Sequence, residues 1–232
     1  ILEMYSLKDK LTFLKITHIP KVSWSSESPF NLKPKLITCF YLFFGLMLFG
    51  LGEALLIVSS LGVTPWTVLA EGVSTIFKIS VGFSTFLISI SILILWIPLK
   101  QKIGIGTISN AIIIASSIDL FVYLLPSVNS YYLSIIYLIL GIVFVGIGSG
   151  FYLITNLGPG TRDGLMKGIS ENFKKPISIV RFIIETVAVI LGWFLGGTVG
   201  LGTIFFAVFI GPLITMSLFL IKIFSKEYRN IG

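Results

Sequence analysis

Cysteine, histidine and charged side chains are all scarce in this chain. The single cysteine, Cys39, excludes an internal disulfide and any cysteine metal cluster. The single histidine, His18, leaves no histidine metal site and no workable Ser-His-Asp set, and no nucleotide-binding loop is visible. We therefore expect no metal, no cofactor and no enzymatic activity.

The scarcity of charge goes with a large excess of apolar residues. Charged residues make up 12% of the chain and hydrophobic residues 55%, and the mean hydropathy is +1.01. A soluble domain of 232 residues could not cover that much apolar surface. Most apolar runs are about 18 to 23 residues long, which suits transmembrane helices and not the short alternating strands of a barrel. The sequence predicts an all-α polytopic membrane protein embedded in the lipid bilayer.

The net charge of +7 indicates topology and no nucleic-acid partner, because the basic residues lie between apolar segments and at the ends. Residues 1–36 form a basic tail without the pattern of a signal peptide. Leu7, Leu11 and Leu14 recur in it at helical spacing. This tail would suit an interfacial helix on the inner membrane surface, and a flexible tail fits equally well.

The rest of the chain, residues 37–232, is predicted to be one membrane domain built from an internal repeat. A shift of 96 residues, without a gap, places Gly104–Ile108 on Gly200–Ile204 and pairs many other glycines. Repeated glycine and threonine matches in one register are hard to obtain by chance. The sequence predicts a tandem duplication, with repeat 1 at about 38–125 and repeat 2 at about 134–221.

Each repeat contains three long apolar segments and one short one. The long segments lie at about 37–59, 82–99 and 103–125, and again at about 131–155, 177–195 and 201–223. The short segments, at about 64–78 and 160–174, are too short and too polar for a confident crossing, so they could re-enter, cross or lie on the membrane.

The distribution of lysine and arginine decides between these topologies. If the short segments do not cross, Lys78 is the one basic residue on the outer side, which satisfies the positive-inside rule best. We therefore predict six transmembrane helices in two inverted three-helix repeats, each with a re-entrant or interfacial half-helix. Both termini are then cytoplasmic.

Polar turns precede both short segments in corresponding places. A half-helix that begins within the membrane presents unpaired N–H groups, which favour an anionic or carboxylate ligand. The alternative is that both segments are surface helices that close the bundle with solvated ends. The candidate solute-binding residues are Thr64, Pro65, Trp66, Thr67, Gly158, Gly160, Thr161, Arg162, Asp163 and Gly164.

Arg162 and Asp163 break the repeat symmetry, because their counterparts Trp66 and Thr67 are uncharged. Arginine offers a planar fork of donors that suits carboxylate or phosphate. Alternatively, Asp163 complements the helix dipole, and Arg162 follows the positive-inside rule.

Four more charged residues lie within predicted spans. Arg181 and Glu185 stand four apart on one helix face, which predicts a structural ion pair near the inner interface. Glu53 and Asp119 fall in the outer third of their spans, where they either form an outer cation or proton site or reach water.

Several short motifs resemble the YczE/YitT-like family of bacterial integral membrane proteins. They are Pro65-Trp66, Gly104-Ile105-Gly106-Thr107, Arg162-Asp163-Gly164-Leu165-Met166, Gly192-Trp193, Gly200-Leu201-Gly202-Thr203 and Ile210-Gly211-Pro212. The likeness covers nearly the whole chain beyond the basic tail. It departs at Thr67, where the family usually has an acidic residue, and at Thr161, where it has proline. The resemblance implies a bacterial cytoplasmic-membrane protein of about six spans, and it supplies no substrate.

Two function classes follow from these features. The first is a small inverted-repeat transporter or channel for a small solute that could be anionic. The alternative is a non-transporting accessory or regulatory membrane protein that binds a partner membrane protein or a lipid-like ligand. Transport predicts a polar cavity where the half-helices meet, and the accessory role predicts a dry core and an exposed apolar groove. A homo-oligomer is compatible with either.

Overall fold

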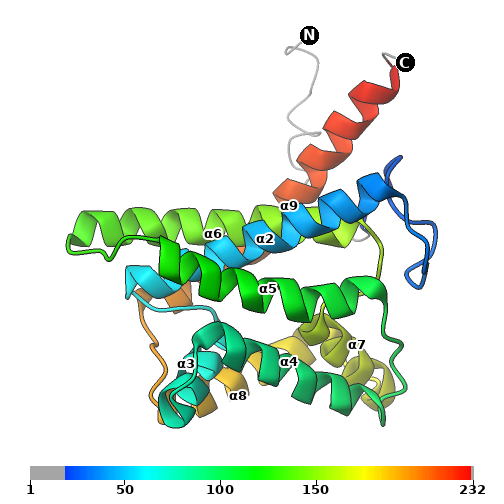
Figure 1. Cartoon of the computed structure of the whole chain (residues 1–232). Helices are drawn as coiled ribbons and strands as arrows, with labels where there is room; N and C mark the ends of the chain where they lie inside the picture. The colour runs from blue at the N-terminus through cyan, green and yellow to red at the C-terminus, as the bar shows by residue number, and fades with distance from the viewer. Residues whose placement is uncertain (1–18, 231–232) are drawn as a thin grey trace.

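The computed structural model describes residues 19–230, and within them it contains helices and loops only (Figure 1). The interfacial helix expected around residues 7–14 lies outside the described residues. The helices are α2 (Leu36–Ser59), α3 (Pro65–Phe77), α4 (Val81–Trp96), α5 (Ile105–Leu124), α6 (Tyr131–Ile154), α7 (Thr161–Phe173), α8 (Ile177–Phe194) and α9 (Leu201–Asn230).

Within this part of the chain, five helices, α2, α5, α6, α8 and α9, are long and apolar enough to cross a membrane. A sixth crossing results if α3 and α4, which meet at an angle of 111°, are taken together as one broken span. α4 alone has only 16 residues and ends three residues before the predicted limit of its span. In the other direction, α9 continues to Asn230, past the predicted limit of its span at about residue 223. The prediction of a polytopic all-α membrane protein is confirmed.

The two short segments form helices of 13 residues each, and their limits differ by the predicted 96 residues. Thr64 caps α3 by accepting a hydrogen bond from the Thr67 N–H, and proline follows at the first helical position. α7 begins after Gly160, which has no side chain to form a cap. Both helices end at a lysine in the left-handed conformation, Lys78 and Lys174.

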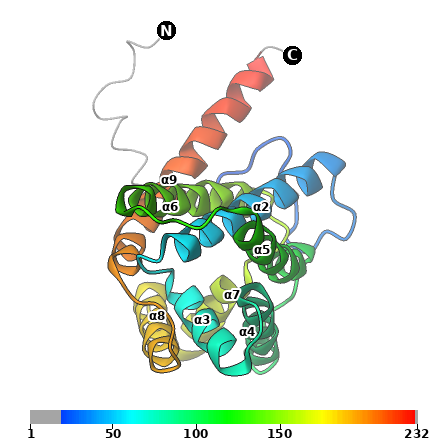
Figure 2. The same ribbon diagram turned by 60° about the vertical axis from the view of Figure 1, so that its left-hand side comes forward.

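The helices form two groups, which Figures 1 and 2 show one above the other. α2, α5, α6 and α9 pack together in the first group, and α3, α4, α7 and α8 in the second. The central contact of the first group joins α2 to α6. A Cβ atom at Gly45 would meet the Gly148 carbonyl oxygen at 2.9 Å, and one at Gly52 would meet the Gly141 oxygen at 2.6 Å. Glycine at these positions therefore allows the two backbones to touch.

The two half-helices pack on helices of the opposite repeat. α3 lies against α8, and α7 lies against α4. Gly192 of α8 touches the backbone of Val68, whereas at the corresponding contact Gly164 of α7 faces the indole ring of Trp96. In the contact between α3 and α8 the glycine lies on α8, whereas in the contact between α4 and α7 it lies on α7. Each contact therefore contains one glycine and one larger residue.

Two backbone hydrogen bonds fix the turns that precede the half-helices. The Leu61 carbonyl accepts from the Gly202 N–H at 2.8 Å, and the Leu157 carbonyl accepts from the Gly106 N–H at 2.7 Å. Each bond also satisfies a donor in the first turn of a span, α9 or α5. The next residues, Gly62 and Gly158, have φ angles of 110° and 116°, which glycine adopts without strain. The starts of α3 and α7 are thereby held at the centre of the molecule.

Candidate functional site

A cavity of about 230 Å³ lies where the starts of α3 and α7 approach the other helices. Residues from all eight described helices line it. Nine pairs of lining residues are separated by 96 positions: Phe49/Val145, Glu53/Ser149, Thr64/Gly160, Pro65/Thr161, Trp66/Arg162, Thr85/Arg181, Ser89/Glu185, Asn110/Phe206 and Ile114/Ile210. The cavity is thus made by corresponding positions of the two repeats.

Most of the predicted solute-binding residues line this cavity. They are Thr64, Pro65, Trp66, Gly160, Thr161, Arg162 and Asp163. Thr67 is fully buried behind the lining. Gly158 packs beside Gly104 and Thr107, and Gly164 packs on Trp96, so these two glycines shape the turn and the helix contact instead of the cavity surface.

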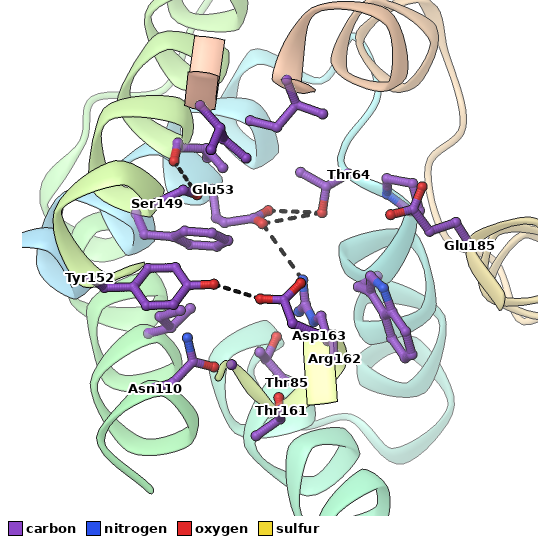
Figure 3. A pocket seen from close by; sticks show the side chains of 18 of the residues that line it. Glu53, Thr64, Thr85, Asn110, Ser149, Tyr152, Thr161, Arg162, Asp163 and Glu185 are labelled. Carbon is purple, nitrogen blue, oxygen red and sulfur yellow. Dashed lines mark hydrogen bonds and ion pairs between the residues drawn. The ribbon is translucent and has the colours of Figure 1, made fainter. Parts of the chain in front are cut away.

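Glu53 of α2 is the buried carboxylate of the cavity (Figure 3). Its Oε2 accepts a hydrogen bond from the Thr67 hydroxyl at 2.6 Å, and the Thr64 hydroxyl lies 3.2 Å from both carboxylate oxygens. Asp119, in contrast, accepts from the Ser80 hydroxyl and the Gly82 N–H at the start of α4. The two acids therefore have separate partners, and of the two only Glu53 lines the cavity.

Arg162 projects from the first turn of α7 into the cavity (Figure 3). Its guanidinium carbon lies 5.3 Å from the centre of the Trp66 ring, and its Nη1 lies 4.0 Å from Glu53 Oε1. The side chain is only 20% exposed. Arg162 therefore does not extend into water, as we would expect of an arginine that serves only the positive-inside rule.

The N–H donors around Arg162 lack acceptors. Within the described residues, the Arg162 guanidinium and the Asn110 amide donate no hydrogen bond, and the Trp66 Nε1 is buried without a partner. All three side chains line the cavity. The Arg162 and Asn110 donors belong to the cavity lining, so they favour a bound group rich in acceptor oxygens, whereas the Trp66 Nε1 has no accessible surface.

The second carboxylate of the cavity is Asp163, whose Oδ2 accepts a hydrogen bond from the Tyr152 hydroxyl at 2.7 Å. The counterparts of Glu53 and Thr67 in the second repeat are Ser149 and Asp163. The first repeat therefore places its carboxylate on the span and its hydroxyl on the half-helix, and the second repeat does the reverse.

Arg181 and Glu185 form the predicted ion pair on α8, with Arg181 Nε 2.9 Å from Glu185 Oε1. Both line the cavity, yet their side chains are 45% and 23% exposed. Their counterparts on α4, Thr85 and Ser89, are buried. The ion pair therefore lies at a place where the cavity wall is open.

The opening results from a difference between the two repeats. In the first repeat α4 packs along α5, where Asp119 binds the start of α4 and Gly82 touches the Ala115 backbone. α8 and α9 make no comparable contact. Gly211 of α9 takes the place of Ala115, and a Cβ atom there would meet nothing within 4 Å. We call this gap between α8 and α9 the open seam.

Several cavity residues carried no clear signal in the sequence. Tyr152 lies in a long apolar segment, and Thr85, Ser89 and Ser149 are small polar residues of the kind that helices commonly bury. Their correspondence to Arg181, Glu185 and Glu53 at the interval of 96 was the available clue. Within residues 19–230, no three histidine, cysteine or acidic side chains are arranged to hold a metal ion.

Comparisons with known proteins agree on a membrane-protein family. Residues 36–218 match the model of a family of unknown function, DUF6198. An uncharacterized protein of Haemophilus influenzae is 39% identical over 200 residues, which cover 86% of this chain and 91% of that protein. The uncharacterized membrane protein YczE of Bacillus subtilis is 32% identical over 181 residues, covering 77% of this chain and 84% of YczE.

A further Bacillus subtilis protein, the uncharacterized protein YyaS, is 30% identical over 165 residues, covering 69% of this chain and 82% of YyaS. No solved structure matches the chain. The family match spans all eight described helices except the end of α9, and therefore includes every residue of the cavity. The chain belongs to the DUF6198 family of YczE-like membrane proteins.

Proposed function

We propose that this protein is a transporter of the bacterial cytoplasmic membrane that carries a small solute with an anionic group. The observation that carries the proposal is the cavity lined by Arg162 and Asn110, whose side-chain donors have no hydrogen-bond acceptor among the described residues. Arginine binds carboxylates through two parallel hydrogen bonds, and low exposure makes such charge-assisted bonds strong. The anionic group of the solute binds at Arg162.

The position of the cavity supports transport. Transporters built from inverted repeats bind their solutes where the repeats meet, close to the starts of broken helices. Here the lining residues come in corresponding pairs, and the starts of α3 and α7 contribute directly to the lining. In the proposed topology, α3 and α7 enter the membrane from opposite sides without crossing it, and both termini are cytoplasmic.

The open seam provides the route to the site. Arg181 and Glu185 lie along this route and are half-exposed, whereas the corresponding contact between α4 and α5 is closed. A carrier alternates access by rocking one repeat against the other around a fixed site. Closing the α8–α9 gap while opening the α4–α5 contact would therefore move the entrance to the opposite side of the membrane.

The accessory role is supported by one feature, an apolar groove of about 640 Å³ between α6 and α9. Leu201, Phe205 and Phe209 line the groove and are 54%, 44% and 48% exposed. Lipid chains would cover this surface, because α6 and α9 are both membrane spans and the groove, unlike the open seam with Arg181 and Glu185, is lined by no charged side chain. The accessory role also predicts a dry core, which the buried Glu53 and Arg162 do not fit.

Solute binding by variants of Arg162 tests the proposed function. Arg162→Ala should weaken the binding of labelled carboxylates to the purified protein by roughly 1–3 kcal/mol, the range for a lost charge-assisted hydrogen bond. Arg162→Lys should restore only part of the loss, because a point charge does not reproduce the planar fork.

The matched control is Lys167→Ala, because Lys167 is on the same helix but is 57% exposed and paired with Glu171. Uptake into proteoliposomes should follow the same order as binding. Equal binding by the wild type and Arg162→Ala would refute the assignment of the site. Binding without any uptake or exchange would favour the accessory role.

A further inference from the structure

We propose that the solute is a zwitterion, a small molecule that carries both a carboxylate and an ammonium group on an apolar body. This inference rests on the proposed function and deepens it by naming the substrate class. Three independent features of the cavity support it: its unpaired donors, its charge balance and its apolar wall.

The donors define one end of the ligand. The Arg162 guanidinium lies 5.3 Å from the centre of the Trp66 ring, so the indole ring forms a wall beside it. The Asn110 amide also lines the cavity and, among the described residues, donates no hydrogen bond. A carboxylate has about four acceptor positions on two oxygens, enough for the guanidinium and for a further donor.

The acidic side chains of the cavity favour a positive group on the ligand. The ionisable residues of the lining are two arginines and three acids: Arg162, Arg181, Glu53, Asp163 and Glu185. Arg181 pairs with Glu185 at 2.9 Å, and Arg162 lies 4.0 Å from Glu53. Asp163 has no basic side chain within 4.0 Å among the described residues. A simple anion leaves this acid without a cation, whereas a zwitterion places a positive group beside it.

The carboxylates of the cavity have acceptor positions to offer an ammonium. Within the described residues, Oδ1 of Asp163 accepts no hydrogen bond, because Tyr152 occupies only Oδ2. Oε1 of Glu53 accepts from the Thr64 hydroxyl alone. Asp163 follows Arg162 directly in the first turn of α7, so the groups for both ends of the ligand lie close together (Figure 3).

The remaining wall of the cavity is apolar. Val145, Phe206 and Ile210 belong to one buried cluster, and Phe49 and Ile214 pack against it. An inorganic ion would gain nothing from this wall, whereas an apolar body would be desolvated there. The volume of about 230 Å³ equals roughly eight water molecules of liquid. This is the size of a single α-amino acid with an apolar side chain.

Matched probes of one shape test the inference. We expect leucine to bind the full-length purified protein at least about tenfold more tightly than 4-methylpentanoate, which lacks the ammonium, or 3-methylbutylamine, which lacks the carboxylate. A tenfold ratio corresponds to about 1.4 kcal/mol, a modest value for one charge-assisted hydrogen bond. Equal binding of leucine and 4-methylpentanoate would overturn the zwitterion and leave the anion site standing. Binding of none of the three would overturn both proposals.

Two variants separate the ends of the ligand. Asp163→Asn keeps an acceptor for the Tyr152 hydroxyl but removes the charge, so it should weaken leucine and leave 4-methylpentanoate unchanged or tighter. Arg162→Ala should weaken both carboxylates and spare 3-methylbutylamine. The control is Glu171→Gln on the exposed part of α7. A merely structural role of Asp163 would weaken leucine and 4-methylpentanoate alike, and that result would contradict its contact with the ammonium.

Discussion

At the scale of single residues, the cavity depends on charges that are held by neutral partners. Glu53 is 1% exposed, and its hydrogen bonds come from threonine hydroxyls. Arg162 stands 4.0 Å away, close enough for a charge interaction but too far for a hydrogen bond. This arrangement leaves the guanidinium available to a ligand while its charge is partly balanced.

Removing either charge should destabilise the protein, because the other then remains buried without compensation. We expect Glu53→Gln and Arg162→Gln each to cost about 1–3 kcal/mol, or a few degrees in Tm for a chain of this size. The double variant should lose less than the sum of the two, since no uncompensated charge remains. Thermal unfolding in detergent measures all three. Additive losses would show that the two side chains do not interact.

At the scale of helices, the half-helices are held by contacts that pair a glycine with a large side chain. Trp96 fills the space above Gly164 and donates a hydrogen bond to the Thr161 carbonyl at 3.1 Å. In the other repeat, Gly192 accommodates Val68. The glycine is therefore needed on α7 and on α8, but not at the corresponding positions of α3 and α4.

A substitution at this contact should act through shape. Gly164→Val would drive its side chain into the Trp96 ring and should cost about 1–3 kcal/mol by overpacking. Adding Trp96→Gly copies the arrangement of the other repeat and should recover part of the loss. Expression level and Tm of the single and double variants test this. A double variant less stable than Gly164→Val alone would contradict the pairing.

The closed contact between α4 and α5 depends on Asp119, which accepts hydrogen bonds from Ser80 and Gly82. In a Cys39→Ser background, maleimide should label Arg181→Cys at the open seam and should not label Thr85→Cys, since Thr85 is 3% exposed. Adding Asp119→Ala should speed the labelling of Thr85→Cys severalfold. Fast labelling of Thr85→Cys with Asp119 intact would show that this contact does not close the cavity.

At the scale of the whole molecule, the contacts between repeats are reciprocal. The contact of Gly45 with Gly148 becomes that of Gly141 with Gly52 when each residue is replaced by its counterpart 96 positions away. The hydrogen bonds of Leu61 and Leu157 exchange in the same way. Contacts that exchange in this way are what the proposed inverted repeat predicts, with corresponding positions of both halves lining one cavity.

The proposed inverted topology predicts opposite sides for the two lysines that end the half-helices. Lys78→Cys should be labelled by an impermeant maleimide from outside intact cells, and Lys174→Cys only after the cells are opened, both in the Cys39→Ser background. A reporter fused at residue 228 should read cytoplasmic, as the excess of inner lysine and arginine requires. Labelling of both lysine positions from one side would require α3 and α7 to cross, with upright repeats.

The sequence by itself determined the membrane class, the helical spans, the short helices and the interval that relates them. These features follow from local patterns: the length of an apolar run, a threonine-proline helix start, a glycine after a turn. It also led to the charged residues of the cavity lining and to the starts of α3 and α7, because the turns before these two helices correspond at 96 residues.

Only the tertiary structure decided what those residues meet. Glu53 is 11 positions from Thr64 and 14 from Thr67, and no local pattern shows that a span and a half-helix bring them together. Likewise, the closed contact between α4 and α5 depends on Asp119 and the open seam includes Gly211, and neither helix by itself shows what these residues meet. Cavities and gaps arise from contacts between distant segments, so their chemistry is fixed by packing and not by the residues of any one segment.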